Sequence, residues 1–331
     1  MTKTDETYIQ SDENHVEFQG KRYRLYSGPK LQGKRSVIDA QSNLYPELLR
    51  QIPHPPTKLY VIGNAALLSE PGLAVIGARR ATPYGLECSN TFAKYAAEKG
   101  IAIISGGAVG CDSRAHRAAL EAQGPTIVVL GGGCDQIYPQ VNYRLFQDII
   151  DRGGAVVSER PWNYPALPFT FRERNRIIAG LAQALLIVEA GLPSGTFSTA
   201  DAALNANRDV LVVPGSICSR TSAGSNKLLY QGAIPIIDKE SFEDVLFSFY
   251  GVLKQEQIMP QDNNVQDDDP LLEALQANPM RLDSILHDIK VPTRVSSNPE
   301  DWLRTHLVEL EAAGLVARYP DGRYGPAKIA S

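Results

Sequence analysis

The sequence predicts an α/β protein: a Rossmann-like, doubly wound and mostly parallel sheet, followed by a small C-terminal winged-helix domain. Between about residues 58 and 245, short apolar runs alternate with helical stretches. The runs are continuously apolar, as in parallel strands that are buried on both faces. Strand–helix–strand alternation over this length favours a doubly wound sheet. Beyond residue 271, three helical patterns precede two short β-type runs, which is the outline of a winged helix.

The core elements follow from their spacing and composition. In Gly85–Lys99, Cys88, Phe92 and Ala96 recur at helical spacing and form one apolar stripe. Ser113–Gln123 is rich in alanine and starts at a serine, a common N-cap residue, so it is predicted as a second helix. The eight apolar runs expected as strands are Leu59–Ile62, Leu73–Gly77, Ile101–Ile104, Thr126–Leu130, Ala155–Val157, Ala184–Val188, Val210–Val213 and Ile234–Ile237.

A further helical stretch, Ser241–Leu253, places Phe242, Leu246 and Phe249 on one aromatic and aliphatic stripe. Such a stripe either closes the core of the domain or forms a twofold contact between two copies of the chain. The sequence gives both interpretations equal support.

The chain divides into four parts by pattern. A pair of short strands is expected within residues 17–28, around a Gly-Lys turn. Basic and acidic residues are nearly balanced in the last part, so a protein contact or a structural role is as well supported there as DNA binding. The parts are an N-terminal segment of uncertain fold, a Rossmann-like core, a flexible acidic linker and a winged-helix-like domain, at residues 1–45, 46–251, 252–270 and 271–331.

Composition excludes several classes of protein. The 331 residues, 43% apolar and 21% charged, are enough for two or three domains with a large core. No apolar run approaches the ~18 residues of a membrane span, and the polar, acidic N-terminus does not resemble a secretory signal. The four cysteines form no CxxC pair, which fits a cytoplasmic protein without a zinc finger or a disulfide scaffold. A net charge of −4 argues against bulk coating of duplex DNA.

Glycine and small polar residues follow five of the expected strands. Ligands of open α/β sheets bind beyond the carboxyl ends of the strands, and glycines let the backbone approach a phosphate. One such loop is usually only a tight turn, but five along one edge indicate an anion-binding rim. The loops are Gly77–Arg80, Ser105–Gly110, Gly131–Gly133, Ser194–Thr196 and Pro214–Ser216.

None of these loops matches a known cofactor motif. The sequence contains neither GxGxxG nor GxxxxGK[ST], so dinucleotide and P-loop ATP sites are poorly supported. No nucleophile–base pair is evident, and we predict no catalytic residue, no cofactor and no metal site. His116 is a candidate base or ligand, but contacts near its own helix explain it better. Asp135 and Glu159, in loops after strands, are candidates to hold arginines by charge pairing.

Residues 169–176, Phe-Thr-Phe-Arg-Glu-Arg-Asn-Arg, are the most highly charged stretch of the core. Arginines pair bidentately with phosphates, and phenylalanine rings offer faces for base stacking. Three basic residues at the start of a helix oppose its dipole, which suggests an anionic ligand. We therefore expect Arg174 and Arg176 to contact phosphates and Phe169 and Phe171 to stack on bases, unless nearby glutamates engage the arginines.

Motifs between about residues 45 and 240 resemble the DprA (Smf) family of DNA-processing proteins, and the segment from 271 resembles the winged-helix end of that family. The strongest match is the run that begins Arg-Asn-Arg. The matching segments are Pro46–Leu49, Leu73–Gly85, Ser105–Gly107, Gly110–Asp112, Gly131–Asp135, Tyr138–Pro139, Asn142, Ser158–Glu159, Arg174–Leu181, Val188–Ala190, Ser194–Thr196, Thr199–Ala200, Val213–Gly215, Gly224–Leu229 and Gly232–Ala233.

The resemblance implies a cytoplasmic, non-enzymatic homodimer that binds single-stranded DNA. It implies that such a protein loads the RecA recombinase and protects incoming DNA in natural transformation. The nucleic-acid-binding residues carried over from the family, together with Phe171 and Arg172 from the charged stretch, are Gly77, Arg79, Ser105, Gly106, Phe171, Arg172, Arg174, Asn175, Arg176, Asn226 and Lys227.

The sequence departs from the family pattern at several positions. Val109 stands where a basic residue is usual, Cys111 where isoleucine is usual, and Arg172 where proline is usual. One hypothesis is that the gain at Arg172 offsets the loss at Val109.

Two other functions use the same fold. One is a sensor module that binds a small nucleotide on the rim. The other is an enzyme similar to the phosphoribohydrolases of the Lonely Guy family, which carry a Gly-Thr-x-x-Glu motif. Thr199 stands where that carboxylate should be, and without it the base for N-glycoside hydrolysis is missing.

Overall fold

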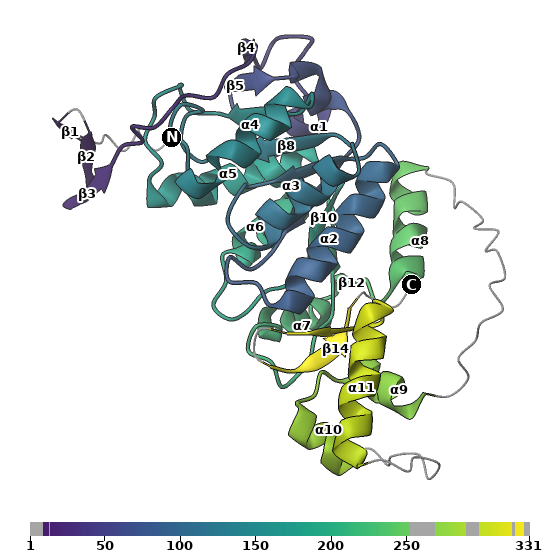
Figure 1. Cartoon of the computed structure of the whole chain (residues 1–331). Coiled ribbons are helices and arrows are strands. Elements are labelled where there is room, and N and C mark those ends of the chain that lie inside the picture. The colour runs from purple at the N-terminus through teal and green to yellow at the C-terminus, as the bar shows by residue number, and fades with distance from the viewer. Residues whose placement is uncertain (1–8, 13, 252–268, 289–297, 320–321, 328–331) are drawn as a thin grey trace. The chain divides into compact units, whose positions relative to one another are not determined.

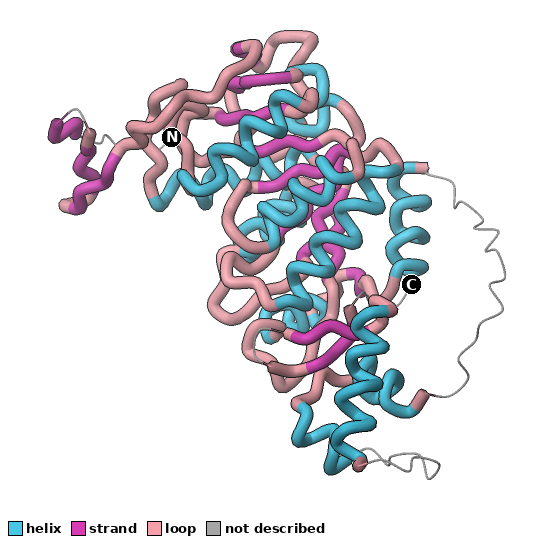
Figure 2. Tube along the Cα trace, in the orientation of Figure 1, coloured by secondary structure: helices cyan, strands magenta, loops and turns pink. Residues whose placement is uncertain are grey.

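The structure, a computed structural model, describes residues 9–12, 14–251, 269–288, 298–319 and 322–327. The chain forms two compact units, Met1–Val252 and Leu253–Ser331. The first unit contains a nine-stranded sheet with helices on both faces and a separate three-stranded sheet (Figure 1, Figure 2). This architecture confirms the predicted α/β fold. Among the described helices, none has the length and apolar character that crossing a bilayer would need.

All eight expected strands are present, and a ninth joins them. In chain order, the strands of the central sheet are β4 (Arg35–Asp39), β5 (Lys58–Gly63), β6 (Gly72–Ile76), β7 (Ala102–Ser105), β8 (Thr126–Val129), β9 (Ala155–Ser158), β10 (Ala184–Ile187), β11 (Asp209–Val212) and β12 (Ile234–Pro235). The strand order is β12-β11-β10-β6-β7-β8-β9-β5-β4. Pairing is parallel from β12 to β9, whereas β5 runs antiparallel to both β9 and β4.

The strand order reverses at β6. From β6 the chain builds the sheet outward to β9, and it then returns to place β10 on the other side of β6. The loops after β6 and β10 therefore leave toward opposite faces. The crevice between such loops is the usual ligand site of an open α/β sheet.

The sheet begins earlier than the sequence pattern suggests. β4 lies within residues 1–45, which were expected to precede the core, yet Ile38 is buried and pairs with Leu59 of β5. An edge strand of five residues with one buried face carries little apolar signal, which explains why it was missed. The expected strand pair around Gly20 is present as β2 (His15–Phe18) and β3 (Lys21–Arg24), which form a three-stranded antiparallel sheet with β1 (Ile9–Asp12).

Helices cover both faces of the central sheet. α2 packs on α3 and α3 on α4 over one face, and α5 packs on α1 and α6 over the other (Figure 1). The helices of this unit are α1 (Glu47–Arg50), α2 (Pro83–Glu98), α3 (Cys111–Glu121), α4 (Tyr143–Asp151), α5 (Pro168–Leu181), α6 (Thr196–Asn205), α7 (Ala223–Tyr230) and α8 (Lys239–Tyr250), with short 3-10 turns η1 (Ala65–Ser69) and η2 (Gln140–Asn142). The prediction that Ser113 caps α3 was wrong: Gly110 occupies the N-cap position, and the Ser113 hydroxyl donates to its carbonyl.

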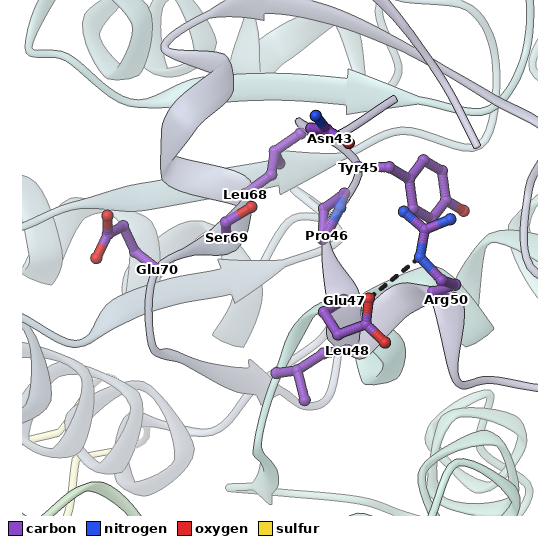
Figure 3. A pocket seen from close by; sticks show the side chains of 9 residues that line it. All are labelled: Asn43, Tyr45, Pro46, Glu47, Leu48, Arg50, Leu68, Ser69 and Glu70. Atoms are coloured by element: carbon purple, nitrogen blue, oxygen red, sulfur yellow. Dashed lines mark hydrogen bonds and ion pairs between the residues drawn. The ribbon is translucent and has the colours of Figure 1, made fainter. Parts of the chain in front are cut away.

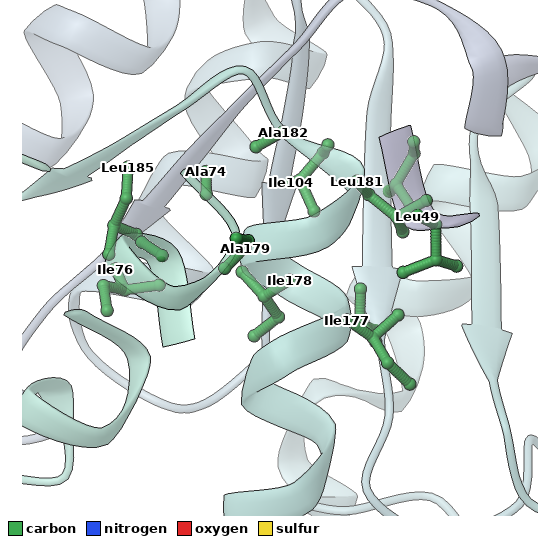
Figure 4. Packing of buried hydrophobic residues seen from close by; sticks show 14 of the residues in the cluster. Leu49, Ala74, Ile76, Ile104, Ile177, Ile178, Ala179, Leu181, Ala182 and Leu185 are labelled. Atoms are coloured by element: carbon green, nitrogen blue, oxygen red, sulfur yellow. The ribbon is translucent and has the colours of Figure 1, made fainter. Parts of the chain in front are cut away.

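The largest core lies between the sheet and α5. Ile177 and Ile178 of α5 and Leu49 of α1 pack with Ile76 and Ile104 of the central strands (Figure 4). Side chains that alternate with these along the strands pack under the helices of the opposite face, so the strands are buried on both sides. This core fixes α5 over the sheet and leaves its first two turns beside the switch point.

The aromatic stripe on α8 closes the core. Phe242 and Leu246 are only 0% and 1% exposed, and the Phe242 ring lies 4.8 Å from the ring of Phe92 on α2. The helix starts at a capping box between Asp238 and Ser241. Because Phe242 and Leu246 are already covered within one chain, they are not available for a contact between two copies.

Truncating this stripe is expected to destabilise the fold without changing the oligomeric state. Leu246→Ala should cost about 2–5 kcal/mol of unfolding free energy, because the cavity left in a packed core cannot fully collapse. The half-exposed Phe247 is the matched control, and Phe247→Ala should change stability by no more than about 0.5 kcal/mol. Urea unfolding and light scattering measure both effects. A Leu246→Ala protein of unchanged stability that dissociates would place a subunit interface here instead.

The described part of the C-terminal unit has three helices and one hairpin. Leu275, Ile285, Leu303 and Leu307 form its core. This matches the predicted outline, and its assignment as a winged helix stays a prediction. The elements are α9 (Pro270–Ala277), α10 (Leu282–Asp288), α11 (Pro299–Ala312), β13 (Val316–Arg318) and β14 (Tyr324–Pro326). Residues 252–268 of the expected linker lie outside the described residues.

Candidate nucleic-acid interface

A groove of about 970 Å³ lies at the switch point of the central sheet. One wall is the segment 76–79 after β6, and the opposite wall is the segment 191–199 that leads into α6. The first turns of α5 form a further side, and Asp112 at the start of α3 and Tyr138 after β8 complete the lining. The groove thus joins segments that follow four strands. Three of the five predicted loops contribute to it, whereas Gly131–Gly133 and Pro214–Ser216 do not.

α5 presents one face to the groove because of its register. The helix begins at Pro168, which fits the first turn, where no backbone N–H partner is needed. Phe171, Arg172 and Asn175 then follow at spacings of three and four residues and line the groove. The Asn175 amide donates to the Ser198 hydroxyl at 2.8 Å, which ties α5 to the opposite wall.

The rim of the groove combines aromatic rings with unpaired cations. The rings of Tyr138 and Phe171 lie 5.1 Å apart, and the Arg79 guanidinium lies 5.9 Å from the Phe171 ring. Arg79 and Arg172 are both exposed, and neither forms an ion pair with a described residue. The arrangement suits a planar, anionic ligand that can stack and pair with guanidinium groups.

Arg174 was expected to contact phosphates, but its side chain is buried and does not extend out of the groove. It is 6% exposed, and its guanidinium donates to the carbonyls of Gly106 and Val129, the former at 2.9 Å. A Cβ on Gly106 would lie 2.7 Å from this guanidinium, so any other residue there would displace the head group of Arg174. Burial lowers the pKa of Arg174 to about 10, against the opposing effect of the Asp112 carboxylate, so the side chain stays protonated at neutral pH. Arg174 therefore holds the loops after β7 and β8 together from the floor of the groove.

Asp112 is a buried carboxyl group whose charge interacts with that of Arg174. The backbone N–H of Ala108 donates to its carboxylate at 3.3 Å. Burial raises the pKa of Asp112, and the positive charge of Arg174 opposes this rise. The two buried charges thus depend on each other.

Arg176 and Phe169 lie outside the groove, contrary to the prediction for the charged stretch. Arg176 forms two hydrogen bonds with the Glu159 carboxylate, at 2.8 and 2.6 Å. The Phe169 ring packs 5.0 Å from Phe18 of the N-terminal sheet. Both differences have one cause: residues adjacent in a helix point about 100° apart, so the stretch cannot turn all its side chains to one ligand.

Of the remaining predicted residues, some hold neighbouring backbone in place and others lie outside the groove. Ser105 is buried, and its hydroxyl donates to the Val75 carbonyl at 2.6 Å. Asn226 on α7 uses its amide to bind both backbone groups of Gly215. Lys227 is exposed but lies over the Phe197 ring at 5.8 Å. Gly77 lines the groove itself, whereas Ser105, Asn226 and Lys227 do not.

The acidic residues after the strands pair as the sequence indicated. Asp135 accepts hydrogen bonds from Arg35 at 2.7 and 3.2 Å, and Glu159 engages Arg176. His116 is buried, and its Nδ1 lies 2.7 Å from the Thr126 hydroxyl. Burial, with the nearby charge of Arg174, lowers the pKa of His116 to about 3, so the ring is neutral at physiological pH. Within the described residues, no cluster of three or more His, Cys, Asp or Glu side chains could hold a metal ion.

Sequence reasoning missed Tyr138 and Asp112 as groove residues. Both lie shortly after the glycine-rich segments that follow β7 and β8. The rule that ligands bind at the carboxyl ends of strands could therefore have pointed to them. Which side chain of such a loop turns inward depends on the loop conformation, which the sequence did not reveal.

A second cavity, of about 360 Å³, lies beside α1 and η1 (Figure 3). Glu47 and Arg50 of α1 form an ion pair at 3.1 Å at its edge, and Tyr45, Leu68 and Glu70 also line it. It shares no residue with the switch-point groove. It contains one arginine that is already paired, so it lacks the unpaired cations of the groove.

The fold and the groove define a Rossmann-like α/β protein with an aromatic and cationic ligand site at the switch point of its sheet. The family described as DNA recombination-mediator protein A matches residues 36–247, which is well over half of the chain. The chain belongs to this DprA/Smf family, as its motifs predicted.

Individual relatives support this membership. The Smf protein of Escherichia coli is 35% identical over 292 residues, covering 88% of this chain and 77% of the relative. The DNA processing protein DprA of Streptococcus pneumoniae is 36% identical over 244 residues, covering 74% of this chain and 80% of the relative.

Two solved structures have the same fold. The crystal structure of the S. pneumoniae protein is 37% identical, with a TM-score of 0.60, and the match covers 65% of this chain and 75% of that one. DNA processing protein A of Helicobacter pylori is 30% identical, also with a TM-score of 0.60, and the match covers 67% of this chain and 100% of that one. The H. pylori structure is described as giving insight into the single-stranded DNA binding mode of that protein.

Proposed function

We propose that this chain binds single-stranded DNA in the switch-point groove and acts as a recombination mediator rather than as an enzyme. The observation that carries the proposal is the placement of two aromatic rings, Tyr138 and Phe171, in the same groove as Arg79 and Arg172, whose guanidinium groups pair with no described carboxylate. Stacking on an aromatic side chain stabilises a bound base by about 1–3 kcal/mol whatever its identity. Phosphate contacts add a sequence-independent, salt-dependent contribution.

This combination favours a single strand over a duplex. In a duplex the base faces are already stacked and paired, so they are not available to Tyr138 and Phe171. A single strand can turn its bases toward the rings while its phosphates meet the arginines at the rim. The H. pylori relative, which has the same fold, is described as binding single-stranded DNA.

The proposal includes what the family membership suggests about partners. We propose that the chain works as a cytoplasmic homodimer, protects incoming single strands during transformation and loads RecA onto them. Assembly of RecA on strands that are precoated with single-strand-binding protein tests the loading step. The wild-type chain should shorten the lag before RecA assembles. With the Phe171→Ala variant, the lag should return to nearly its length without the chain. An equal lag with and without the wild-type chain would refute RecA loading while leaving DNA binding intact.

Photocrosslinking tests where the strand lies. A thymidine-rich oligonucleotide with 5-bromodeoxyuridine at each position in turn is irradiated with the wild-type chain, and the adducts are mapped by mass spectrometry. We expect adducts on Tyr138 or Phe171. Adducts confined to the C-terminal unit would move the binding site out of the groove.

Removing residues 255–331 is expected to leave the core folded. α8 ends at Tyr250, and Gly251 terminates it in a left-handed conformation, so the core is complete before the deletion begins. The affinity for single strands should fall by less than about tenfold, because the deleted segment has 7 basic and 13 acidic residues and therefore no net positive charge to attract phosphates. Circular dichroism and anisotropy titration check these two expectations. A larger loss of affinity would make the C-terminal unit a main DNA contact.

A further inference from the structure

A third cavity, distinct from the one beside α1, adjoins the groove and is lined by four arginines. It has a volume of about 350 Å³ and lies where the starts of α2 and α3 come together. Arg79, Arg80, Arg114 and Arg117 line it, and no acidic residue does. Arg79 also lines the groove, so the two concave surfaces share a side chain.

Three of these arginines have no counter-charge in the part of the chain that the structure describes. Arg114 is engaged by Glu121 at 3.0 Å and by Asn90 at 2.6 Å. In contrast, Arg79, Arg80 and Arg117 are exposed, and none of them forms an ion pair with a described residue. Like charges gathered on one concave surface repel each other, and an anionic ligand would relieve this repulsion.

The lining indicates which part of a nucleic acid fits. The other lining residues are Ala81, Leu86, Gly110 and Ser113, so the cavity offers no aromatic ring for a base. Guanidinium groups without a stacking partner suit phosphodiester oxygens. The cavity therefore differs in chemistry from the groove, where rings and cations occur together.

We propose that a strand bound in the groove continues past Arg79 into this cavity, where Arg80 and Arg117 hold its phosphates. The inference rests on the proposed function, since it extends the path of the same single strand. It predicts that the cavity contributes only when the strand is long enough to leave the groove. Its contribution comes from the phosphates, so it depends on salt and not on base identity.

The test is an anisotropy titration of oligothymidine at two lengths. About 5 nucleotides is near the lower limit of known single-strand sites, and about 20 nucleotides exceeds their upper limit of about 16. The variant is Arg80→Glu with Arg117→Glu, and Arg80→Gln with Arg117→Gln is a milder version. Both residues are exposed, so the variants should unfold in urea at the wild-type midpoint. Lys21→Glu with Arg24→Glu makes the same change of charge on the exposed strand β3, away from both cavities, and serves as the matched control.

We expect the glutamate variant to lose at least about tenfold in affinity for the long strand and to flatten its log–log salt slope by about 1.4, which is two phosphate contacts. Affinity for the short strand should stay within about twofold of wild type, because that strand does not leave the groove. Equal losses at both lengths, no loss at either, or an equal loss in the control variant would each overturn the extension. If the wild-type chain binds neither strand, the proposed function fails and the extension fails with it.

Discussion

Replacing Arg79 and Arg172 together by glutamate is expected to weaken binding of single-stranded DNA by at least about 25-fold at about 0.1 M salt. Both side chains are exposed at the rim of the groove and lack counter-charges among the described residues, so they are free to meet phosphates. Each contact acts through counterion release, so losing two should flatten the log–log salt slope by about 1.4 for any strand sequence. Anisotropy titrations at four or five salt concentrations measure affinity and slope together.

The aromatic half of the site should respond differently. Phe171→Ala should cost about 1–3 kcal/mol, or about 5- to 150-fold in affinity, with an unchanged salt slope. Phe169 is the matched control, because it lies two residues away on the same helix but packs against Phe18. Phe169→Ala should leave affinity within about twofold of wild type. If Phe169→Ala costs as much affinity as Phe171→Ala, the strand does not follow the groove.

Arg174→Met is expected to destabilise the core by about 3–5 kcal/mol, because it leaves the Asp112 carboxylate buried without its counter-charge. The change also removes the donor from the carbonyls of Gly106 and Val129. Urea unfolding measures the loss. Adding Asp112→Asn to Arg174→Met should recover part of it, since the uncompensated charge is then gone. A variant of wild-type stability that fails to bind DNA would instead make Arg174 a direct phosphate contact.

The loss should also depend on pH. Burial raises the pKa of Asp112 above its ordinary value of 3.8, and removing Arg174 raises it further. Above pH 3.8 the folded protein then holds a proton that the unfolded chain has released, so stability falls as pH rises through the raised pKa. The stability gap between wild type and Arg174→Met should therefore be smaller at low pH than at neutral pH. A gap that is the same across this range would show that the Asp112 charge is not the cause.

Strand positions and the location of the site were predictable from the sequence because both depend on local pattern. Continuous apolar runs marked the buried strands, and the glycine-rich segments after them marked the edge where the groove lies. β4 was missed because Arg35–Asp39 is a short edge strand with one buried face, whose pattern resembles that of a surface loop. For Phe242 and Leu246 of the stripe on α8, only the packing in the structure showed that they belong to the core, whereas Phe249 is partly exposed.

Assigning roles within the charged stretch required the three-dimensional register. The linear sequence of residues 169–176 contains three arginines and two phenylalanines, and it does not show which of them face a ligand. The helix turns Phe171 and Arg172 into the groove, buries Arg174 beneath it and directs Arg176 to Glu159. Tyr138, not Phe169, supplies the second ring. A helical register counted from Pro168 would have separated these faces, but the sequence analysis placed the three arginines together at the start of the helix.

Titration of the wild-type chain with matched labelled single-stranded and duplex DNA of one sequence tests the central claim most directly. At physiological salt we expect the single strand to bind more tightly than the duplex by at least about tenfold, because only its bases can stack on Tyr138 and Phe171. The affinity for the single strand should fall linearly with salt on a log–log scale. Equal affinity for the two forms, or tighter binding of the duplex, would contradict a groove built for single strands.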